Sequence, residues 1–210
     1  MKKVLKNVSF VILVLKMCIV FGQEKRAQKR IVIDVGHGGK DTGAIGINKI
    51  QEKDVVLSIA NAMLKLNNAL EKPLDIYLTR YSDTLISLSD RTKLAKALKA
   101  DLFVSLHCNH SDNLDARGIE VYASQKETNN SKESIYIGYQ IEKALCNTIG
   151  YESRGVKFAN FQVLRETISY CSAILLELGF LSNIDESGYL SSSTNIKLMA
   201  LTILLSIQKQ

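Results

Sequence analysis

Five short apolar runs, separated by longer stretches with helical periodicity, constrain the fold of this 210-residue chain more than any other feature. The runs read as β-strands and occupy residues 31–35, 74–79, 101–106, 118–123 and 172–178. Helical patterns between and after them cover residues 54–70, 87–100, 131–150 and 194–208. Such alternation predicts a single α/β domain with a mostly parallel, twisted sheet and helices on both faces.

The helical stretches carry their own packing and boundary signals. The first places Val55, Ile59 and Met63 along one face, which we expect to lie against the sheet. Ser89 is expected to cap the N-terminus of the second helix, and Gly150 is expected to end the third. These signals support four helices of ordinary length that cover the strands.

The N-terminal 22 residues have the layout of a secretory signal peptide. Three early lysines precede an apolar run, and the small residue Gly22 offers a cleavage point. Lys16 interrupts the run, and the segment is shorter than the roughly 20 apolar residues that a membrane span needs. We therefore favour export over a membrane anchor, with residues 23–30 as a charged tether and membrane contact limited to the leader during export.

The formal net charge of +6 gives little support for a nucleic-acid partner. The leader contributes four lysines and no acids, so its cleavage removes most of the excess positive charge. Nucleic-acid binding would need a clustered basic face, which the remaining charge does not indicate. Three cysteines follow the leader, Cys108, Cys146 and Cys171, and no CxxC pair suggests a thiolate zinc site. We expect them to be small buried hydrophobes with at most one disulfide.

A glycine-rich loop follows the first apolar run, in the sequence IVIDVGHGGKDTGAIG at 31–46. Five glycines in eleven residues suggest that the backbone comes close to something. Asp41 stands where a phosphate-binding loop needs Ser or Thr, and where a dinucleotide fingerprint needs glycine. The loop is therefore not a nucleotide cradle, and it leaves His37 at the carboxyl end of a strand, where open parallel sheets bind ligands.

Three further residues with reactive side chains fall near this predicted edge. His107 directly follows the run at 101–106, Glu52 follows the glycine loop, and Glu177 lies within the last strand. Two imidazoles and a carboxylate are a common zinc set with one open position, and a second carboxylate can move protons. Structural alternatives remain open: either histidine can be a satisfied polar residue, and Glu52 can simply favour a helix N-terminus.

Seven sequence motifs, found between about residue 30 and residue 208, follow one another in the same order as in a known protein family. The motifs are IVIDVGHGGKDTGAIG, QEKD, YLTRYSD, DLFVSLHCNHS, ARGIEVY, RGVKFANFQVLRE and ILLELGFLSN. Together they resemble the zinc-dependent N-acetylmuramoyl-L-alanine amidases of the amidase-3 family. The resemblance implies an exported enzyme that cleaves the amide between N-acetylmuramic acid and L-alanine in peptidoglycan.

The family pattern assigns roles to the residues already singled out. By resemblance, His37, Glu52 and His107 hold one Zn²⁺ ion, and Glu177 is the catalytic carboxylate. Residues 31–210 would form the catalytic domain, whose partner is the peptidoglycan glycan strand with its stem peptide. We expect a monomer, located in the periplasm or else secreted or bound to the cell wall.

Other positions are expected to shape or contact the substrate site. Gly36, Gly38 and Gly39 are expected to let the backbone curl around the metal and to leave room for a bulky glycan strand. Asn160 and Arg165 are candidates to contact peptide carboxylates or sugar oxygens, and a purely structural role stays open for both. Cys108 departs from the small residue usual in the family; strand alternation predicts that it points away from the metal. The stretch between 122 and 150 has room for one ordinary helix, so no long inserted plug is expected.

Two other functions stay open at this point. Zinc–glutamate chemistry would equally serve a peptidase that cuts within the stem peptide. A non-catalytic peptidoglycan-binding protein is the third possibility, although such a protein has no need for Glu177.

Overall fold

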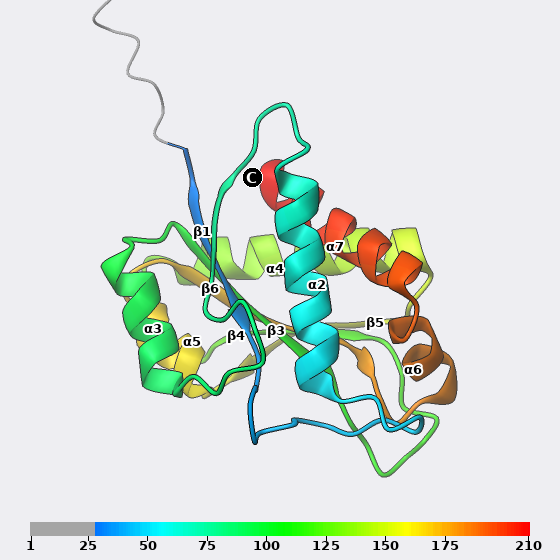
Figure 1. Ribbon diagram of the computed structural model, residues 1–210. Coiled ribbons are helices and arrows are strands. Elements are labelled where there is room, and N and C mark those ends of the chain that lie inside the picture. Colours follow the sequence, from blue (N-terminus) through cyan, green and yellow to red (C-terminus); the bar gives the residue numbers. More distant parts are fainter. Residues whose placement is uncertain (1–27) are drawn as a thin grey trace, which may run out of the picture.

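A six-stranded sheet forms the centre of the structure, a computed structural model that describes residues 28–210 (Figure 1). The strand order is β2-β1-β3-β6-β4-β5. The strands are β1 (Arg30–Val35), β2 (Asp75–Leu78), β3 (Leu102–Asn109), β4 (Ile119–Ser124), β5 (Ser153–Ala159) and β6 (Ser172–Phe180). Strands β2, β1, β3 and β6 are parallel, whereas β4 runs antiparallel to β6 and parallel to β5. The prediction of a mostly parallel sheet is confirmed.

Helices cover both faces of this sheet (Figure 1). One face carries α2 (Glu52–Asn67), α4 (Ser131–Ile149) and α7 (Ser193–Gln208); the other carries α3 (Leu88–Ala97) and α5 (Gln162–Thr167). A short helix, α6 (Ile184–Leu190), follows β6. The predicted two-sided covering is therefore confirmed, and the stretch between 122 and 150 holds a single helix, α4, that packs on the sheet.

Alternating strand residues divide the core into two clusters. Val104 and Ile174 belong to the larger cluster, together with Ile59 and Met63 of α2, and all four are completely buried. Phe103 faces the other way, into the cluster beneath α3 and α5. Because residues of opposite parity point to opposite faces, this division also decides on which face each site residue of β3 and β6 lies.

Several local predictions need correction. Ser87, not Ser89, caps α3, and its Oγ accepts a hydrogen bond from the Asp90 N–H at 3.2 Å. Helix α2 begins at Glu52 rather than at residue 54, since the acidic first turn favours that helix end. Gly150 ends α4 as predicted, in the left-handed conformation with φ 77°.

Three elements were not predicted at all: β5, α5 and α6. Strand β5 lies at the edge of the sheet, where no residue is fully buried, so it lacks a clear apolar pattern. The two missed helices have six and seven residues, too few for a helical periodicity to stand out.

The predictions for the leader and most of the tether fall outside the described residues. Strand β1 begins at Arg30, one residue inside the expected tether, and the Arg30 N–H donates to Asp101 Oδ2 at 2.8 Å. Between residues 28 and 210, no single helix is long and apolar enough to cross a membrane. The bent pair α6–α7 meets that test together, by length and composition only.

Candidate active site and metal centre

His37 stands just beyond β1 in a backbone conformation that is uncommon for a residue with a side chain, with φ 56°. Its Nδ1 lies 2.9 Å from Asp41 Oδ2 and its Nε2 lies 3.0 Å from Glu52 Oε1. Burial alone would lower the pKa of His37, but the two carboxylates raise it to about 8. Asp41 orients the ring as the outer partners of metal-binding histidines commonly do.

Two buried arginines hold the backbone that carries His37. Arg91 donates to the carbonyl oxygens of Val35 and His37, at 2.6 and 2.8 Å. Arg80 donates to the carbonyl oxygens of Val35 and Gly36, at 3.1 and 2.8 Å. Three consecutive carbonyls are thus bonded to side chains that are each 3% exposed, which supports the strained turn from outside.

Asp34 anchors this arrangement inside the protein. Its carboxylate, 1% exposed, accepts from Arg91 Nη1 at 2.9 Å, Thr79 Oγ1 at 3.0 Å and Ser105 Oγ at 2.7 Å. A buried charge persists only when it is paired and hydrogen-bonded, as this one is. Sequence reasoning missed this network because its members come from β1, β3, α3 and the end of β2 and meet only in the fold.

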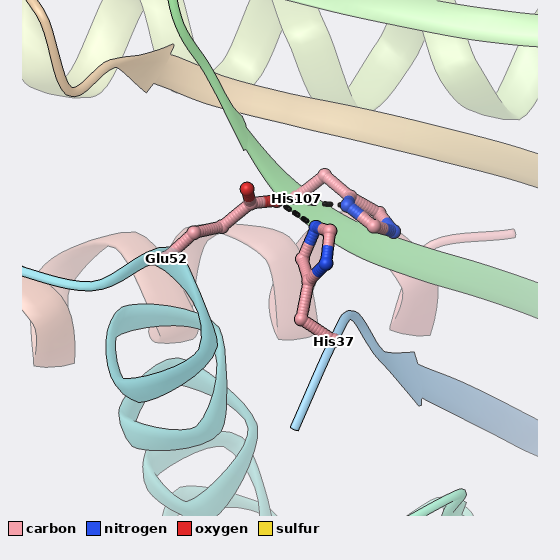
Figure 2. Close-up of side chains that lie close together, drawn as sticks. All are labelled: His37, Glu52 and His107. Carbon is pink, nitrogen blue, oxygen red and sulfur yellow. Dashed lines mark hydrogen bonds and ion pairs between the residues drawn. The ribbon is translucent and has the colours of Figure 1, made fainter. Parts of the chain in front are cut away.

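Glu52, the first residue of α2, lies between the two histidines (Figure 2). Oε1 accepts from His107 Nδ1 at 2.8 Å and from the Cys108 N–H at 3.0 Å, and Oε2 accepts from the Ala44 N–H at 2.8 Å. Burial would raise the pKa of Glu52, but its hydrogen bonds with His107 and His37 hold it well below the usual range. This carboxylate is therefore a permanent anion.

His37, Glu52 and His107 together offer three donor atoms that all lie within 4.8 Å of one another. The two imidazole rings meet edge to face, with centroids 4.9 Å apart. All three side chains are partly or largely buried, with exposed fractions of 23%, 5% and 20%. Two imidazole nitrogens and one carboxylate oxygen are the donors of a catalytic zinc site that keeps a position open, so these residues fit such an ion.

Two glycines make this convergence possible. A Cβ at Gly36 would lie 2.6 Å from the His107 ring, and a Cβ at Gly43 would overlap Glu52 Oε2 and lie 2.6 Å from the His37 ring. Gly36 was among the glycines predicted to shape this site, whereas Gly43 was not singled out. Gly38 and Gly39 adopt φ angles of 126° and 58°, which provide the predicted tight backbone turn, and Cβ atoms there would meet residues 84 and 85. The relation of these glycines to a bound metal stays a prediction.

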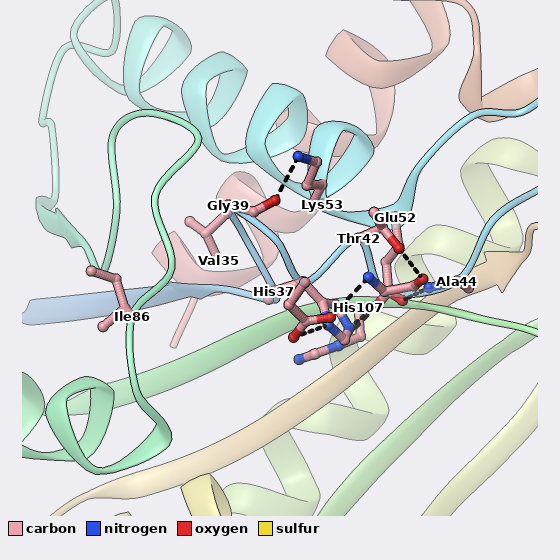
Figure 3. Close-up of polar contacts among 12 residues, drawn as sticks. Val35, His37, Gly39, Thr42, Ala44, Glu52, Lys53, Ile86 and His107 are labelled. Atoms are coloured by element: carbon pink, nitrogen blue, oxygen red, sulfur yellow. Dashed lines mark hydrogen bonds and ion pairs between the residues drawn. The ribbon is translucent and has the colours of Figure 1, made fainter.

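Lys53 connects the glycine loop to the neighbouring segment. Its Nζ donates to the Gly39 carbonyl at 2.9 Å (Figure 3). The same Nζ donates to Asp83 Oδ2 at 2.7 Å. Asp83 in turn accepts from the Gly39 N–H at 2.7 Å. Both backbone groups of Gly39, its N–H and its carbonyl, are therefore hydrogen-bonded to side chains, which fixes the loop in place.

Glu177 lies in β6, beside His107 in the register of β3 with β6. Its Oε2 atom is buried and has no hydrogen-bond partner among the described residues. Burial is the largest cause that raises the pKa of Glu177 to about 7; His107 opposes it, and the charges of Glu52 and Glu120 add smaller upward shifts. A carboxyl group in this condition can both accept and release a proton near neutral pH.

Glu120, on β4, faces Glu177 across the antiparallel pair and is bonded very differently. It accepts hydrogen bonds from Lys157 Nζ at 2.8 Å, from Tyr122 Oη at 2.8 Å and from Arg154 Nε. Burial would raise the pKa of Glu120, but these donors lower it below its ordinary value. Sequence reasoning missed this cluster, because nothing in the sequence pairs β4 with β5 and β6.

Cys108 points away from the site, as strand alternation predicts. It is 3% exposed and belongs to the core cluster on the α2 side, and burial raises the pKa of its thiol well above the ordinary value. Cys108, Cys146 and Cys171 are all free thiols in the part of the chain that the structure describes.

The predicted substrate contacts lie close together: Asn160 precedes α5, and Arg165 is in its last turn. Arg165 Nη1 donates to the backbone oxygen and to Oδ1 of Asn160, both at 2.9 Å. Both residues are exposed, and their role in substrate binding stays a prediction.

A cavity of about 610 Å³ opens directly onto the two histidines. Leu85, Leu88, Asp41 and Asp90 line it, along with other residues of the 85–91 segment. Leu85 and Leu88 are 45% and 49% exposed. The candidate metal centre therefore has a substrate-sized approach on the α3 side.

Fold and site together define an α/β protein with a His–Glu–His cluster that could hold a metal ion, at the carboxyl edge of the parallel strands. The sequence profile of the N-acetylmuramoyl-L-alanine amidase family, amidase-3, matches residues 31–209. The chain belongs to this family.

Individual relatives agree with this assignment. The chain is 37% identical over 164 residues to the N-acetylmuramoyl-L-alanine amidase LytC of Bacillus subtilis, covering 78% of this chain and 32% of LytC. It is 35% identical over 173 residues to a sporulation-specific amidase of the same species, covering 81% of this chain and 64% of that one. The chain thus spans less than two thirds of the length of these two relatives.

Solved structures show the same fold. The catalytic domain of the amidase CwlV from Bacillus (Paenibacillus) polymyxa superposes with a TM-score of 0.74 at 37% identity, covering 86% of this chain and 97% of CwlV. An N-acetylmuramoyl-L-alanine amidase from Clostridium difficile 630 gives a TM-score of 0.79 at 32% identity, covering 87% and 96%.

Proposed function

We propose that this protein is a zinc-dependent N-acetylmuramoyl-L-alanine amidase that hydrolyses the amide between N-acetylmuramic acid and L-alanine in peptidoglycan. The observation that carries the proposal is the convergence of His37, Glu52 and His107 within 4.8 Å, beside the unpaired carboxyl oxygen of Glu177. Membership of the amidase family supports the choice of bond.

His37, Glu52 and His107 would hold the ion, and one zinc is expected for three protein ligands. When bound, zinc supplies a Lewis acid that polarises a carbonyl and lowers the pKa of water. Asp41 keeps the ring of His37 in place through Nδ1, which leaves Nε2 for the metal.

Glu177 would act as the proton carrier. Its unpaired Oε2 would accept a proton from the attacking water and later deliver it to the departing L-alanine nitrogen, which leaves only when protonated. The raised pKa of Glu177, about 7, suits both transfers. No described residue donates a hydrogen bond to this oxygen, so it is available for the reaction.

The test is mass spectrometry of purified peptidoglycan after digestion, with and without a zinc chelator. We expect free stem peptides that begin at an unblocked L-alanine, and their loss on chelation. Metal content of the same preparation, measured by elemental analysis, checks for one zinc per chain. Stem peptides cut internally would instead support the peptidase, and no release by a zinc-loaded protein would support a peptidoglycan-binding protein.

We also propose that the protein is exported, with the periplasm as its location. The charged and then apolar layout of residues 1–22 supports this. Cell fractionation followed by N-terminal sequencing tests it, with Gln23 expected as the first residue of the mature chain. Recovery of the intact N-terminus in the cytosol would contradict the proposal.

A further inference from the structure

A cluster around Glu120 lies next to the proposed catalytic carboxyl group and has no part in the chemistry described so far. Lys157 and Arg154 of β5 both bond to the same oxygen, Glu120 Oε1. Two cations therefore share one buried carboxylate, which is 3% exposed. With Glu120 alone, the two cations leave one positive charge in surplus, and the nearest further acidic group on the sheet is Glu177, which faces Glu120 across the strand pair.

That surplus charge is accessible to a ligand. The side chains of Lys157 and Arg154 are 41% and 36% exposed. The Lys157 ammonium has three N–H donors, and Glu120 accepts only one of them. Held on one side by a buried anion, the two cations are already oriented and lose little freedom when they bind another anion.

Strand register fixes how far this charge lies from the metal centre. His107, Glu177 and Glu120 occupy matching positions on the adjacent strands β3, β6 and β4. Two strand spacings separate Glu120 from His107, or about 10 Å between backbones. An extended peptide advances about 3.5 Å per residue, so the cluster lies within reach of the second or third residue beyond a bond cleaved at the metal.

The other side of the metal centre has the opposite character. The cavity there is lined by Leu85 and Leu88 and by the carboxylates of Asp41 and Asp90. Acidic groups disfavour an acidic ligand, whereas exposed leucines suit the methyl groups of a neutral glycan. The charge distribution across the site is therefore asymmetric.

We infer that Lys157 and Arg154 form a subsite for an acidic stem peptide, specifically for the free α-carboxylate of a γ-linked D-glutamate at its second position. This inference rests on the proposed function and adds an orientation to it. The stem peptide extends over β4 and β5, and the glycan lies on the Leu85–Leu88 side. Lys157 and Arg154 contact substrate in this arrangement but take no part in proton transfer.

Titration calorimetry with the zinc-loaded protein tests the subsite independently of catalysis. The probes are two dipeptides whose γ-carboxyl group is blocked as a methylamide, L-alanyl-D-glutamate and its α-carboxamide counterpart, L-alanyl-D-isoglutamine, which differ only in the charge of the α-group. We expect the acid to bind about three- to tenfold more tightly than the amide, as for a partly exposed charged hydrogen bond. The preference should shrink as ionic strength rises.

Variants separate this subsite from general effects of charge. Lys157→Gln should abolish the preference for the acid, and Lys157→Arg should keep it. Lys197→Gln, the same loss of charge on exposed α7, is the control and should leave the preference unchanged. Glu120→Gln removes the internal counter-charge and should strengthen binding of the acid.

Two results would overturn the inference: equal affinity of the wild-type protein for both dipeptides, or a preference that survives Lys157→Gln. If Lys157→Gln fails to fold, Arg154→Gln carries the same expectation. Hydrolysis of peptidoglycan is assayed separately. A protein that cleaves the amide without discriminating between the dipeptides contradicts only the subsite, whereas one that cleaves nothing contradicts the proposed function.

Discussion

The Glu52 region and the Glu177 region carry the same functional group at the same edge of the sheet, yet they are built in opposite ways. Both oxygens of Glu52 are bonded, to two histidines and two backbone N–H groups. Glu177 keeps one buried oxygen without a partner. The pKa of Glu52 lies well below its usual range, whereas that of Glu177 is raised to about 7.

This difference separates two tasks that one carboxylate performs poorly. A metal ligand, the role proposed for Glu52, must stay ionised and fixed, and the saturated hydrogen bonds of Glu52 suit that role. A proton carrier must gain and lose a proton at working pH, which requires an environment that does not favour the charged form strongly. The surroundings of each carboxylate, rather than its chemistry, decide which task it can serve.

The largest expected effect comes from Glu177→Gln. The amide keeps the shape of the side chain but cannot carry the proton, so kcat should fall by about 10²- to 10⁴-fold. Zinc content should stay at the wild-type level, since Glu177 is not among the proposed ligands. Glu71→Gln, the same change on an exposed loop, is the control; hydrolysis by Glu177→Gln at the wild-type rate would remove Glu177 from its role.

Glu52→Gln should instead act on the metal. Loss of the anionic ligand is expected to weaken zinc affinity by more than about a hundredfold, because outer partners alone contribute 10- to 100-fold. Competition with a chromogenic chelator measures the affinity. Zinc binding as tight as that of the wild type would show that Glu52 is not a ligand and would break the comparison.

Asp41→Asn tests how much the support of His37 contributes to metal binding, since Asp41 is hydrogen-bonded to the His37 ring. The asparagine retains the size of the side chain but removes the carboxylate that holds Nδ1, so we expect zinc affinity to fall by about 10- to 100-fold. The same chelator competition reports it. A loss of kcat at full zinc occupancy with unchanged affinity would place Asp41 in substrate binding rather than in support of the metal site.

The smallest effect on activity is expected for Glu120→Gln, and it is measured as a shift of the pH–rate profile. The negative charge of Glu120 is one cause of the raised pKa of Glu177, after burial and Glu52. Its removal lowers that pKa. Because Glu177 must be ionised to accept a proton, the acidic limb of the profile should move to lower pH, by less than about one unit. A shift to higher pH would contradict this coupling.

The sequence alone was enough for the fold class and for the three residues that cluster at the candidate metal centre. Alternating apolar and helical stretches predict a parallel sheet with two covered faces, because both periodicities are local. His37, His107 and Glu177 could be recognised because each interrupts or directly follows an apolar run. Edge strand β5 and the short helices α5 and α6 were not predicted, because their sequences show no clear strand or helix periodicity of apolar residues.

Only the tertiary structure decided how these residues are supported and how differently the two carboxylates are bonded. Asp34 meets Arg91 across 57 positions of sequence, and Glu120 meets Lys157 across 37. Gly43 matters because Glu52 and His37 approach it, which no local pattern records. Contacts of this kind depend on strand order and register, and those are set by the packing of the whole sheet rather than by neighbouring residues.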